Sequence, residues 1–341
     1  MSKYTARQVH LISRPVGMPT SEDFKLVDVE LEPPQDGQVL VNNIYLSVDP
    51  YMRGRMRAEG TYAKPYALNE VMYGGAIGEV IESNDSSLQA GDTVLNQAAW
   101  QDKFVANAKN MSKITPFDAE KLSLYLGTLG MPGMTAYLGL LKFGEPKEGE
   151  TVFVSAASGA VGANVCQIAK LKGCRVIGSV GSDEKARWLL DEVGVDGVIN
   201  YKTCGNLTEA LAQAAPDGID VYFENVGGDV SRAVAPLLNA GSRVPICGYI
   251  SQYNAKDIAS AESPFEVFGA LPNPPEHRFF LVFEWDAEHA ETTQKLADWL
   301  RSGELKYRES VADGIDAAIG AFRGMLRGEN FGKQLVKIAD A

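Results

Sequence analysis

A turn of small residues between two apolar segments gives the first indication of chemistry in this 341-residue chain. Residues 151–154 (Thr-Val-Phe-Val) predict a buried strand, and apolar residues at helical spacing predict a helix that begins near Ala160. A strand, a small-residue turn and a helix in this order can hold a pyrophosphate against backbone N–H groups. Against the G-x-G-x-x-G pattern, Gly159 and Gly162 match the second and third glycines, whereas Ala157 stands at the first.

The end of the next predicted strand, 175–180, bears on which dinucleotide would bind. An enzyme that uses NAD would place an Asp or Glu there for the ribose hydroxyls, but no carboxylate follows until Asp183. Lys185 lies in the first turn of the following predicted helix, within reach of a ribose phosphate. The missing acid and the nearby cation favour NADP over NAD. On spacing alone, an ordinary small-residue turn and a solvated surface lysine are equally good interpretations.

Residues 128–298 alternate between predicted strands and helices, which indicates a doubly wound parallel sheet with helices on both faces. The expected strands are 151–154, 175–180, 197–200, 219–224, 242–247 and 279–283. The expected helices are 160–172, 183–193, 206–215, 229–239 and 291–301. The stretch 249–278 is rich in Pro, Ser and Asn, and we expect a long loop or lid there.

Residues 1–127 are predicted to form a separate β-rich domain. Short strands at 39–46, 78–82 and 93–96 are separated by dense turn signals, which is typical of a compact, partly closed β structure. We expect the C-terminal segment 299–341, with its strand-like residues 334–338, to complete this domain.

The composition narrows the classes of function. A net charge of −12 argues against a general nucleic-acid-binding surface or binding to an anionic membrane. The four cysteines form no C-x-x-C pair and suit a reducing compartment. The N-terminal residues lack the apolar core of a signal peptide, and no apolar run reaches membrane-spanning length. We therefore expect a cytoplasmic protein.

A catalytic metal is not expected. The three histidines, His10, His277 and His289, lie neither near a cysteine nor at a spacing that would ligate zinc. The glycine-rich turn at 73–78 contains no histidine. Zinc chemistry is therefore not predicted.

Longer motifs resemble a known family. They are SVDPYMR (47–53), GTLGMPGMTAY (127–137), SAASGAVG (155–162), GSDEK (181–185), NYKT (200–203), YFENVGG (222–228), ICGYISQYN (246–254) and ENFGK (329–333). With these motifs in this order, the chain resembles the zinc-independent medium-chain dehydrogenases/reductases. Within them it resembles the prostaglandin reductases and the NADPH-dependent double-bond reductases of 2-alkenals, enones and curcumin-type compounds. The resemblance implies a Rossmann sheet, a GroES-like, partly closed β-barrel catalytic domain and a homodimer.

The resemblance also implies residues that bind NADP(H). The pyrophosphate would be cradled by Gly159, Ala160, Val161 and Gly162, and the 2′-phosphate held by Lys185 and Tyr201. The adenosine and the nicotinamide ribose would be lined by Asn225 and by residues 247–253, which include Cys247 and Tyr253; Phe280, Leu281 and Val282 would pass beside the nicotinamide, and Asn330 would close over the cofactor. The structural alternatives are turn formers at both asparagines and a core strand at 280–282.

The implied reaction is the reduction of a C=C bond conjugated to a carbonyl group. Hydride addition at the β-carbon builds an enolate, which needs a hydroxyl donor near its oxygen and a proton at the α-carbon. Tyr253 is the candidate donor, assisted by a ribose hydroxyl of the cofactor, while Tyr51 and Tyr73 are candidates to contact the substrate. Tyr249 supplies a second hydroxyl close by. The alternatives are a quinone reductase, an alcohol dehydrogenase or a non-enzymatic NADPH-binding protein, and the sequence does not name the substrate.

Overall fold

The computed structural model divides the chain into two units, and it describes residues 4–59, 63–115, 121–257 and 261–340. Unit 1 comprises Met1–Leu126 and Glu309–Ala341, and unit 2 comprises Gly127–Arg308. Unit 2 therefore runs beyond the boundary expected at 298. The reason is that helix α8 (His289–Arg301) packs against α2 (Met131–Gly139) of the same unit, and the chain re-enters unit 1 only with strand β15.

Unit 2 contains the predicted parallel sheet, with strand order β11-β10-β9-β12-β13-β14. The strands are β9 (Thr151–Val154), β10 (Arg175–Val180), β11 (Gly197–Asn200), β12 (Ile219–Phe223), β13 (Leu238–Ile246) and β14 (Glu276–Phe279). The chain runs outward from β9 to β11 and then returns to β12 on the other side of β9. The order therefore reverses between β9 and β12, where doubly wound sheets bind ligands at the carboxyl edge.

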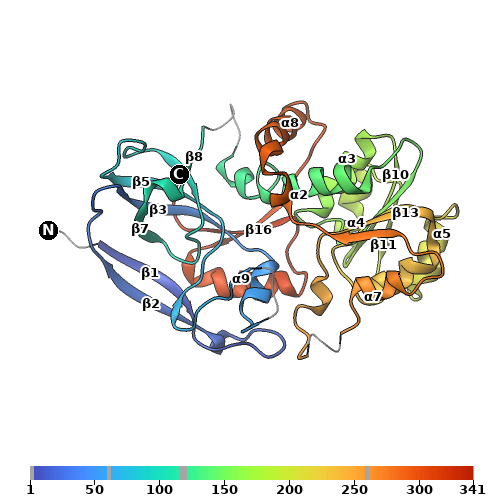
Figure 1. Ribbon diagram of the computed structural model, residues 1–341, viewed down its shortest axis with the longest axis horizontal. Helices are drawn as coiled ribbons and strands as arrows, with labels where there is room; N and C mark the ends of the chain where they lie inside the picture. Colours follow the sequence, from blue (N-terminus) through green and yellow to red (C-terminus); the bar gives the residue numbers. More distant parts are fainter. Residues whose placement is uncertain (1–3, 60–62, 116–120, 258–260, 341) are drawn as a thin grey trace. The chain divides into compact units, whose positions relative to one another are not determined.

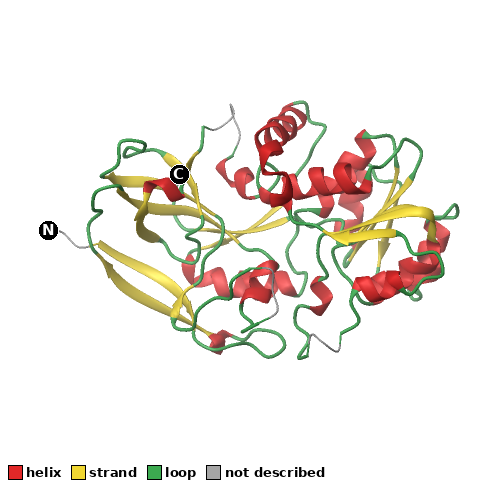
Figure 2. Cartoon of the chain, viewed as in Figure 1, coloured by secondary structure: helices red, strands yellow, loops and turns green. Residues whose placement is uncertain are grey.

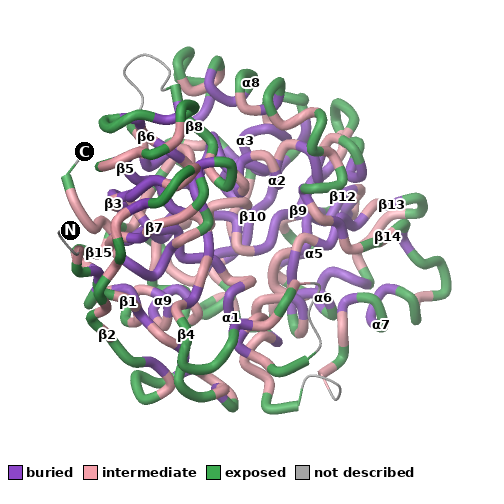
Figure 3. The backbone as a smooth tube through the Cα atoms, turned by 60° about the vertical axis from the view of Figure 1, so that its left-hand side comes forward, coloured by how far each residue is buried: buried purple, intermediate pink, exposed green. Residues whose placement is uncertain are grey.

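Helices cover both faces of this sheet. On one face α2, α3 (Gly162–Leu171) and α8 contact one another through α2, and α4 (Asp183–Trp188) packs on β10. On the other, α5 (Leu207–Ala214), α6 (Asp229–Val234) and α7 (Pro264–Gly269) form a second contacting group. The two groups lie on opposite sides of the strands (Figure 1). Figure 3 shows that the central strands are buried between them, so the predicted doubly wound α/β fold is confirmed.

The strand expected at 279–283 in unit 2 is wrong. The strand predicted at 279–283 ends at Phe279, and a 3-10 helix spans Val282–Glu288. The Leu281 N–H donates to the Glu284 carboxylate at 2.7 Å, which turns the chain out of the sheet. Residues 280–282 are therefore not a core strand.

The stretch 249–278 is more structured than the long loop or lid that was expected. It contains a short 3-10 helix at Ile250–Gln252, the helix α7 and the strand β14. Helix α7 begins with a capping box, in which Ser263 and Glu266 bond each other's backbone, and with a proline at its first position. These are local start signals that the composition of the stretch obscured.

Unit 1 is built mainly from strands (Figure 2), and most of them pair antiparallel. One sheet has the order β2-β1-β4, and the larger has the order β15-β16-β3-β5-β6-β8, with β7 also pairing with β3. The strands are β1 (Tyr4–Leu11), β2 (Phe24–Leu31), β3 (Gln38–Ser47), β4 (Glu70–Val71), β5 (Ala76–Ser83), β6 (Thr93–Asn96), β7 (Lys103–Asn107), β8 (Ser112–Lys113), β15 (Glu309–Asp313) and β16 (Lys333–Lys337). Strand β16 pairs with β3, so the C-terminal segment completes the domain.

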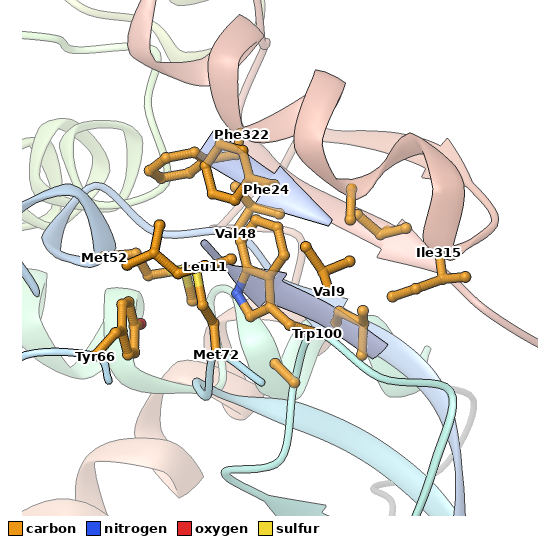
Figure 4. Close-up of a cluster of buried hydrophobic side chains, with 14 of the residues drawn as sticks. Val9, Leu11, Phe24, Val48, Met52, Tyr66, Met72, Trp100, Ile315 and Phe322 are labelled. Carbon is orange, nitrogen blue, oxygen red and sulfur yellow. The ribbon is translucent and has the colours of Figure 1, made fainter. Parts of the chain in front are cut away.

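A hydrophobic core in unit 1 holds the short helix α1 (Tyr51–Arg55) in place. Trp100 lies at its centre, stacked on Phe24 at 6.5 Å between ring centroids and meeting Phe322 of helix α9 (Ala318–Leu326) edge-on at 5.8 Å. Met52 of α1 is fully buried in the same cluster (Figure 4). Because Met52 is anchored in the core, its neighbour Tyr51 has a fixed position at the start of α1.

Candidate active site

The small-residue turn between β9 and α3 has the geometry of an anion cradle. A Cβ atom on Gly162 would lie 2.3 Å from the carbonyl oxygen of Ala156, so only glycine allows the helix to start this close to the turn. Ala156 itself adopts a positive φ of 50°. Within the part of the chain that the structure describes, the N–H groups of Ala160, Val161 and Gly162 donate to no protein acceptor. Backbone N–H groups at the start of a helix are suited to a pyrophosphate.

A cationic group with a hydroxyl lies at the end of β10, where the sequence lacks a carboxylate. A Cβ atom on Gly181 would meet the Tyr201 hydroxyl at 2.6 Å and Cε of Lys202 at 3.3 Å, so both side chains lie against this turn. Burial, and then the charge of Lys202, lowers the pKa of Lys185. Because a phosphate dianion would relieve this repulsion, the Lys185–Tyr201–Lys202 group suits a ribose phosphate.

Lys202 is a candidate site residue that was not expected from the sequence. It belongs to the NYKT motif, directly after Tyr201, but neighbouring residues in a chain need not face the same ligand. Its proximity to Lys185 comes from the packing of the β11 end against the β10 end, which are paired in parallel register.

Asn225 joins the loop after β12 to the small-residue turn. Its side-chain amide donates to the carbonyl oxygen of Ser155 at 2.8 Å, and its backbone N–H donates to the Ser155 hydroxyl at 2.9 Å. The structure therefore places Asn225 beside the cradle and gives its amide N–H a structural partner. A contact from Asn225 to a ribose stays a prediction.

Residues 247–253 continue along the same edge of the sheet. The Cys247 N–H donates to the Glu224 carbonyl oxygen at 2.9 Å. Burial, with a smaller contribution from the Glu224 charge, raises the pKa of Cys247 to about 12, so the thiol is protonated at neutral pH. The rings of Tyr249 and Tyr253 meet edge-on at 5.7 Å, and a Cβ atom on Gly248 would lie 2.7 Å from the Tyr253 hydroxyl. The loop thus fixes the candidate proton donor against its own backbone.

Phe280 serves as packing in unit 2. Its ring lies across helix α2, because a Cβ atom on Gly139 would come within 2.2 Å of it, and it meets Phe223 edge-on at 6.0 Å. Phe280 and Val282 are buried, whereas Leu281 is half-buried. The expected passage of residues 280–282 beside a nicotinamide stays a prediction.

Unit 1 brings the two other candidate tyrosines together. A Cβ atom on Gly74 would lie 3.3 Å from the Tyr51 hydroxyl, so Tyr51 contacts the turn that carries Tyr73. Both tyrosines are half-buried.

Asn330 of the C-terminal segment donates its side-chain amide to the carbonyl oxygen of Gly332 at 2.7 Å, as a turn former would.

Arg55, one helical turn after Tyr51, is a second residue that the sequence analysis missed. Its guanidinium carbon lies 4.0 Å from the ring centroid of Tyr73 and 4.7 Å from that of Tyr66, and its Nε donates to the Lys64 carbonyl oxygen at 3.0 Å. Such cation–π contacts hold the Tyr73 ring in a fixed orientation beside Tyr51.

A buried ion pair anchors the segment that leads into α1. The Lys333 ammonium donates to Asp49 Oδ1 at 3.0 Å and to the carbonyl oxygens of Val48 at 2.7 Å and Gln334 at 3.0 Å. Asp49 and Lys333 are both almost fully buried. The pair joins the SVDPYMR motif to the ENFGK motif, so both motifs contribute to the structure of unit 1.

The described residues offer neither a metal-binding cluster nor a membrane-spanning helix. They contain no group of three or more His, Cys, Asp or Glu side chains that could hold a metal ion. Among the same residues, no helix is both long and apolar enough to cross a membrane.

Comparison with known proteins identifies relatives over nearly the full length. Residues 7–114 match a family described as the N-terminal domain of oxidoreductase, and residues 160–267 match one described as zinc-binding dehydrogenase. The chain is 42% identical to the NADPH-dependent curcumin reductase of Escherichia coli, over 99% of this chain and 98% of that protein. It is 43% identical to prostaglandin reductase 1 of Bos taurus, over 94% and 96% respectively.

A plant enzyme and a crystal structure extend the same relationship. The 2-alkenal reductase (NADP(+)-dependent) of Nicotiana tabacum is 40% identical, over 98% of this chain and 97% of that protein. The crystal structure of CurA from Vibrio vulnificus in complex with NADPH superposes with a TM-score of 0.92 at 42% identity, over 98% of this chain and 100% of that chain. Given full-length identity of this order and the shared two-domain fold, the chain belongs to the curcumin, prostaglandin and 2-alkenal reductase family of the medium-chain dehydrogenases/reductases.

Proposed function

We propose that this protein is an NADPH-dependent reductase of the C=C bond in α,β-unsaturated aldehydes and ketones. The observation that carries the proposal is the Lys185–Tyr201–Lys202 group at the end of β10, together with the small-residue turn, whose N–H groups at 160–162 have no acceptor among the described residues. Together they provide donors for a pyrophosphate and for a 2′-phosphate. The family relationship supplies the class of substrate.

The residues of this chain have distinct tasks in the proposed reaction. When bound, NADPH supplies the hydride that adds to the β-carbon of the substrate. The Tyr253 hydroxyl donates a hydrogen bond to the carbonyl oxygen, on which negative charge develops, and this stabilises the enolate. Tyr51 and Tyr73 contact the substrate and orient it. A proton then reaches the α-carbon, with Tyr253 as the proposed source and Tyr249 as the alternative.

A single assay distinguishes this function from its alternatives. Purified protein is incubated with NADPH and, in turn, with an enone, a quinone and a simple saturated ketone, and the products are identified. A saturated ketone as the sole product from the enone supports the proposal. Hydroquinone or alcohol as the main product would support a quinone reductase or an alcohol dehydrogenase, and tight NADPH binding without consumption would support a binding protein.

Substitution of Lys185 by alanine should affect NADPH and leave NADH nearly unaffected. A lost charge-assisted contact of about 1.5–3 kcal/mol corresponds to a rise of roughly 10- to 150-fold in the KM for NADPH. Initial rates with both cofactors measure the effect. Lys172→Ala, at an exposed lysine after the C-terminal end of α3, is the matched control and should change neither value. Equal losses for both cofactors in the Lys185 variant would exclude a phosphate contact.

The preference for NADPH should also depend on pH. The phosphate is attracted to the protonated form of Lys185, whose pKa lies below the ordinary value of 10.5 in the free protein. The ratio of the NADH to the NADPH dissociation constant should therefore begin to fall with rising pH before pH 10.5 is reached. Lys185→Arg should shift this fall to higher pH, because a guanidinium keeps its proton there.

A further inference from the structure

Glu224 is a fully buried carboxylate at the end of β12 that the proposed mechanism does not use. Its Oε1 accepts hydrogen bonds from the hydroxyl of Tyr222 at 2.6 Å and from the N–H groups of Val226 at 2.8 Å and Gly227 at 2.9 Å. Its Oε2 accepts from the Ser231 hydroxyl of α6 at 2.5 Å. No lysine or arginine among the described residues forms an ion pair with it.

A further contact connects Glu224 to the anion cradle. The Ser155 hydroxyl, at the first residue after β9, donates to Glu224 Oε1 at 3.2 Å. The same hydroxyl accepts the N–H of Asn225, and the Ser155 N–H donates to the Phe223 carbonyl oxygen at 3.3 Å. Glu224 therefore contacts both loops that leave the sheet between β9 and β12, where the strand order reverses.

Burial of a carboxylate without a cation is expensive, and donors on every side are needed to offset it. Here those donors are Ser155 of one loop, the backbone of Val226 and Gly227 of the other, and the hydroxyls of Tyr222 in β12 and Ser231 in α6. Each loop is thus fixed relative to one common group. An apolar side chain at this position would leave two backbone N–H groups and several hydroxyls without an acceptor.

We propose that Glu224 is a positioning residue for cofactor binding, which sets the small-residue turn and the loop 225–228 in the arrangement that receives the dinucleotide. It acts through Ser155 and the backbone of Val226 and Gly227, not by contact with the reacting atoms. This inference rests on the proposed cofactor-binding edge of unit 2.

Glu224→Gln tests the role of the charge at nearly constant volume. Glutamine has one acceptor oxygen in place of two and carries donors on the other atom, so it cannot accept from both Ser231 and the loop backbone without rearrangement. We expect the dissociation constants for NADPH and NADH to rise by at least about tenfold, and by similar factors, because the pyrophosphate is common to both. The KM for NADPH should rise by a larger factor than kcat falls. Glu224→Asp, which keeps the charge, should recover part of the affinity.

Asp220 provides a matched control at the opposite end of the same strand. Its carboxylate accepts the Thr151 N–H at 2.9 Å and the Asn239 amide at 2.8 Å, so it also joins β12 to β9 but lies at the amino edge of the sheet. Asp220→Asn should lower stability without changing either dissociation constant. A purely structural role for Glu224 predicts the same behaviour for both variants.

Binding is measured by calorimetric titration with each cofactor, and folding by circular dichroism and urea unfolding. Dissociation constants within twofold of the parent in a folded Glu224→Gln protein, or an equal loss in Asp220→Asn, would overturn the inference. Should Glu224→Gln fail to fold, Ser155→Ala removes the link from Glu224 to the turn, together with the acceptor of the Asn225 N–H. It should weaken the binding of both cofactors alike, and unchanged binding would also overturn the inference. Because binding is measured without substrate, the dissociation constants test this inference even if the protein lacks the proposed reductase activity.

Discussion

Replacing Lys333 by methionine should lower the free energy of unfolding by about 3–5 kcal/mol, because Asp49 then becomes a buried charge that has lost its cation and keeps the hydrogen bond from the Ser47 hydroxyl. The Lys333 ammonium donates to Asp49 and to two carbonyl oxygens in a site that water hardly reaches. Methionine fills the volume of the lysine stem, so the loss reports the charge and not a cavity. Urea unfolding measures it.

A second ion pair on the same strand serves as the control. Lys337 bonds Asp340 at 2.6 Å, but the Asp340 side chain is 94% exposed. Lys337→Met should therefore cost less than about 1 kcal/mol. Adding Asp49→Asn to the Lys333 variant removes the stranded charge and should restore part of the stability. A loss below about 1 kcal/mol in Lys333→Met would mean that the buried pair adds nothing to unit 1.

Replacing Tyr253 by phenylalanine should lower kcat for an enone by roughly ten- to a thousandfold if its hydroxyl stabilises the enolate. Phenylalanine keeps the ring that meets Tyr249 edge-on at 5.7 Å, so we expect the loop to keep its conformation. Steady-state rates at saturating NADPH measure the effect, and NADPH affinity checks that the cofactor site is intact.

Tyr249→Phe is the matched variant for this experiment, since Tyr249 lies in the same loop and its ring contacts the ring of Tyr253. It should leave kcat within a few-fold of the parent. If instead Tyr253→Phe retains full activity and Tyr249→Phe loses it, the donor is Tyr249. Full activity in both would assign the hydrogen bond to the ribose of the cofactor.

The sequence by itself determined the architecture of unit 2. Alternating strands and helices leave few arrangements other than a parallel sheet, and the turn at 155–162 marks its first crossover. Local signals were sufficient for such elements because burial on both faces imposes an apolar run on each strand, as at Thr151–Val154. The capping role of Ser182 also follows from local sequence, and the structure shows its side chain accepting the Lys185 N–H.

Only the tertiary structure decided which distant groups meet. Lys202 beside Lys185, Arg55 on Tyr73 and the Asp49–Lys333 pair each depend on how separate segments pack, which hydrophobic periodicity does not encode. The strand expected at 279–283 failed for a different, local reason, because the Glu284 carboxylate accepts the Leu281 N–H three residues before it. Glu224 is the strongest case. From sequence alone a carboxylate is expected at the surface, and only the donors that β12, α6 and the two loops bring together make its complete burial tolerable.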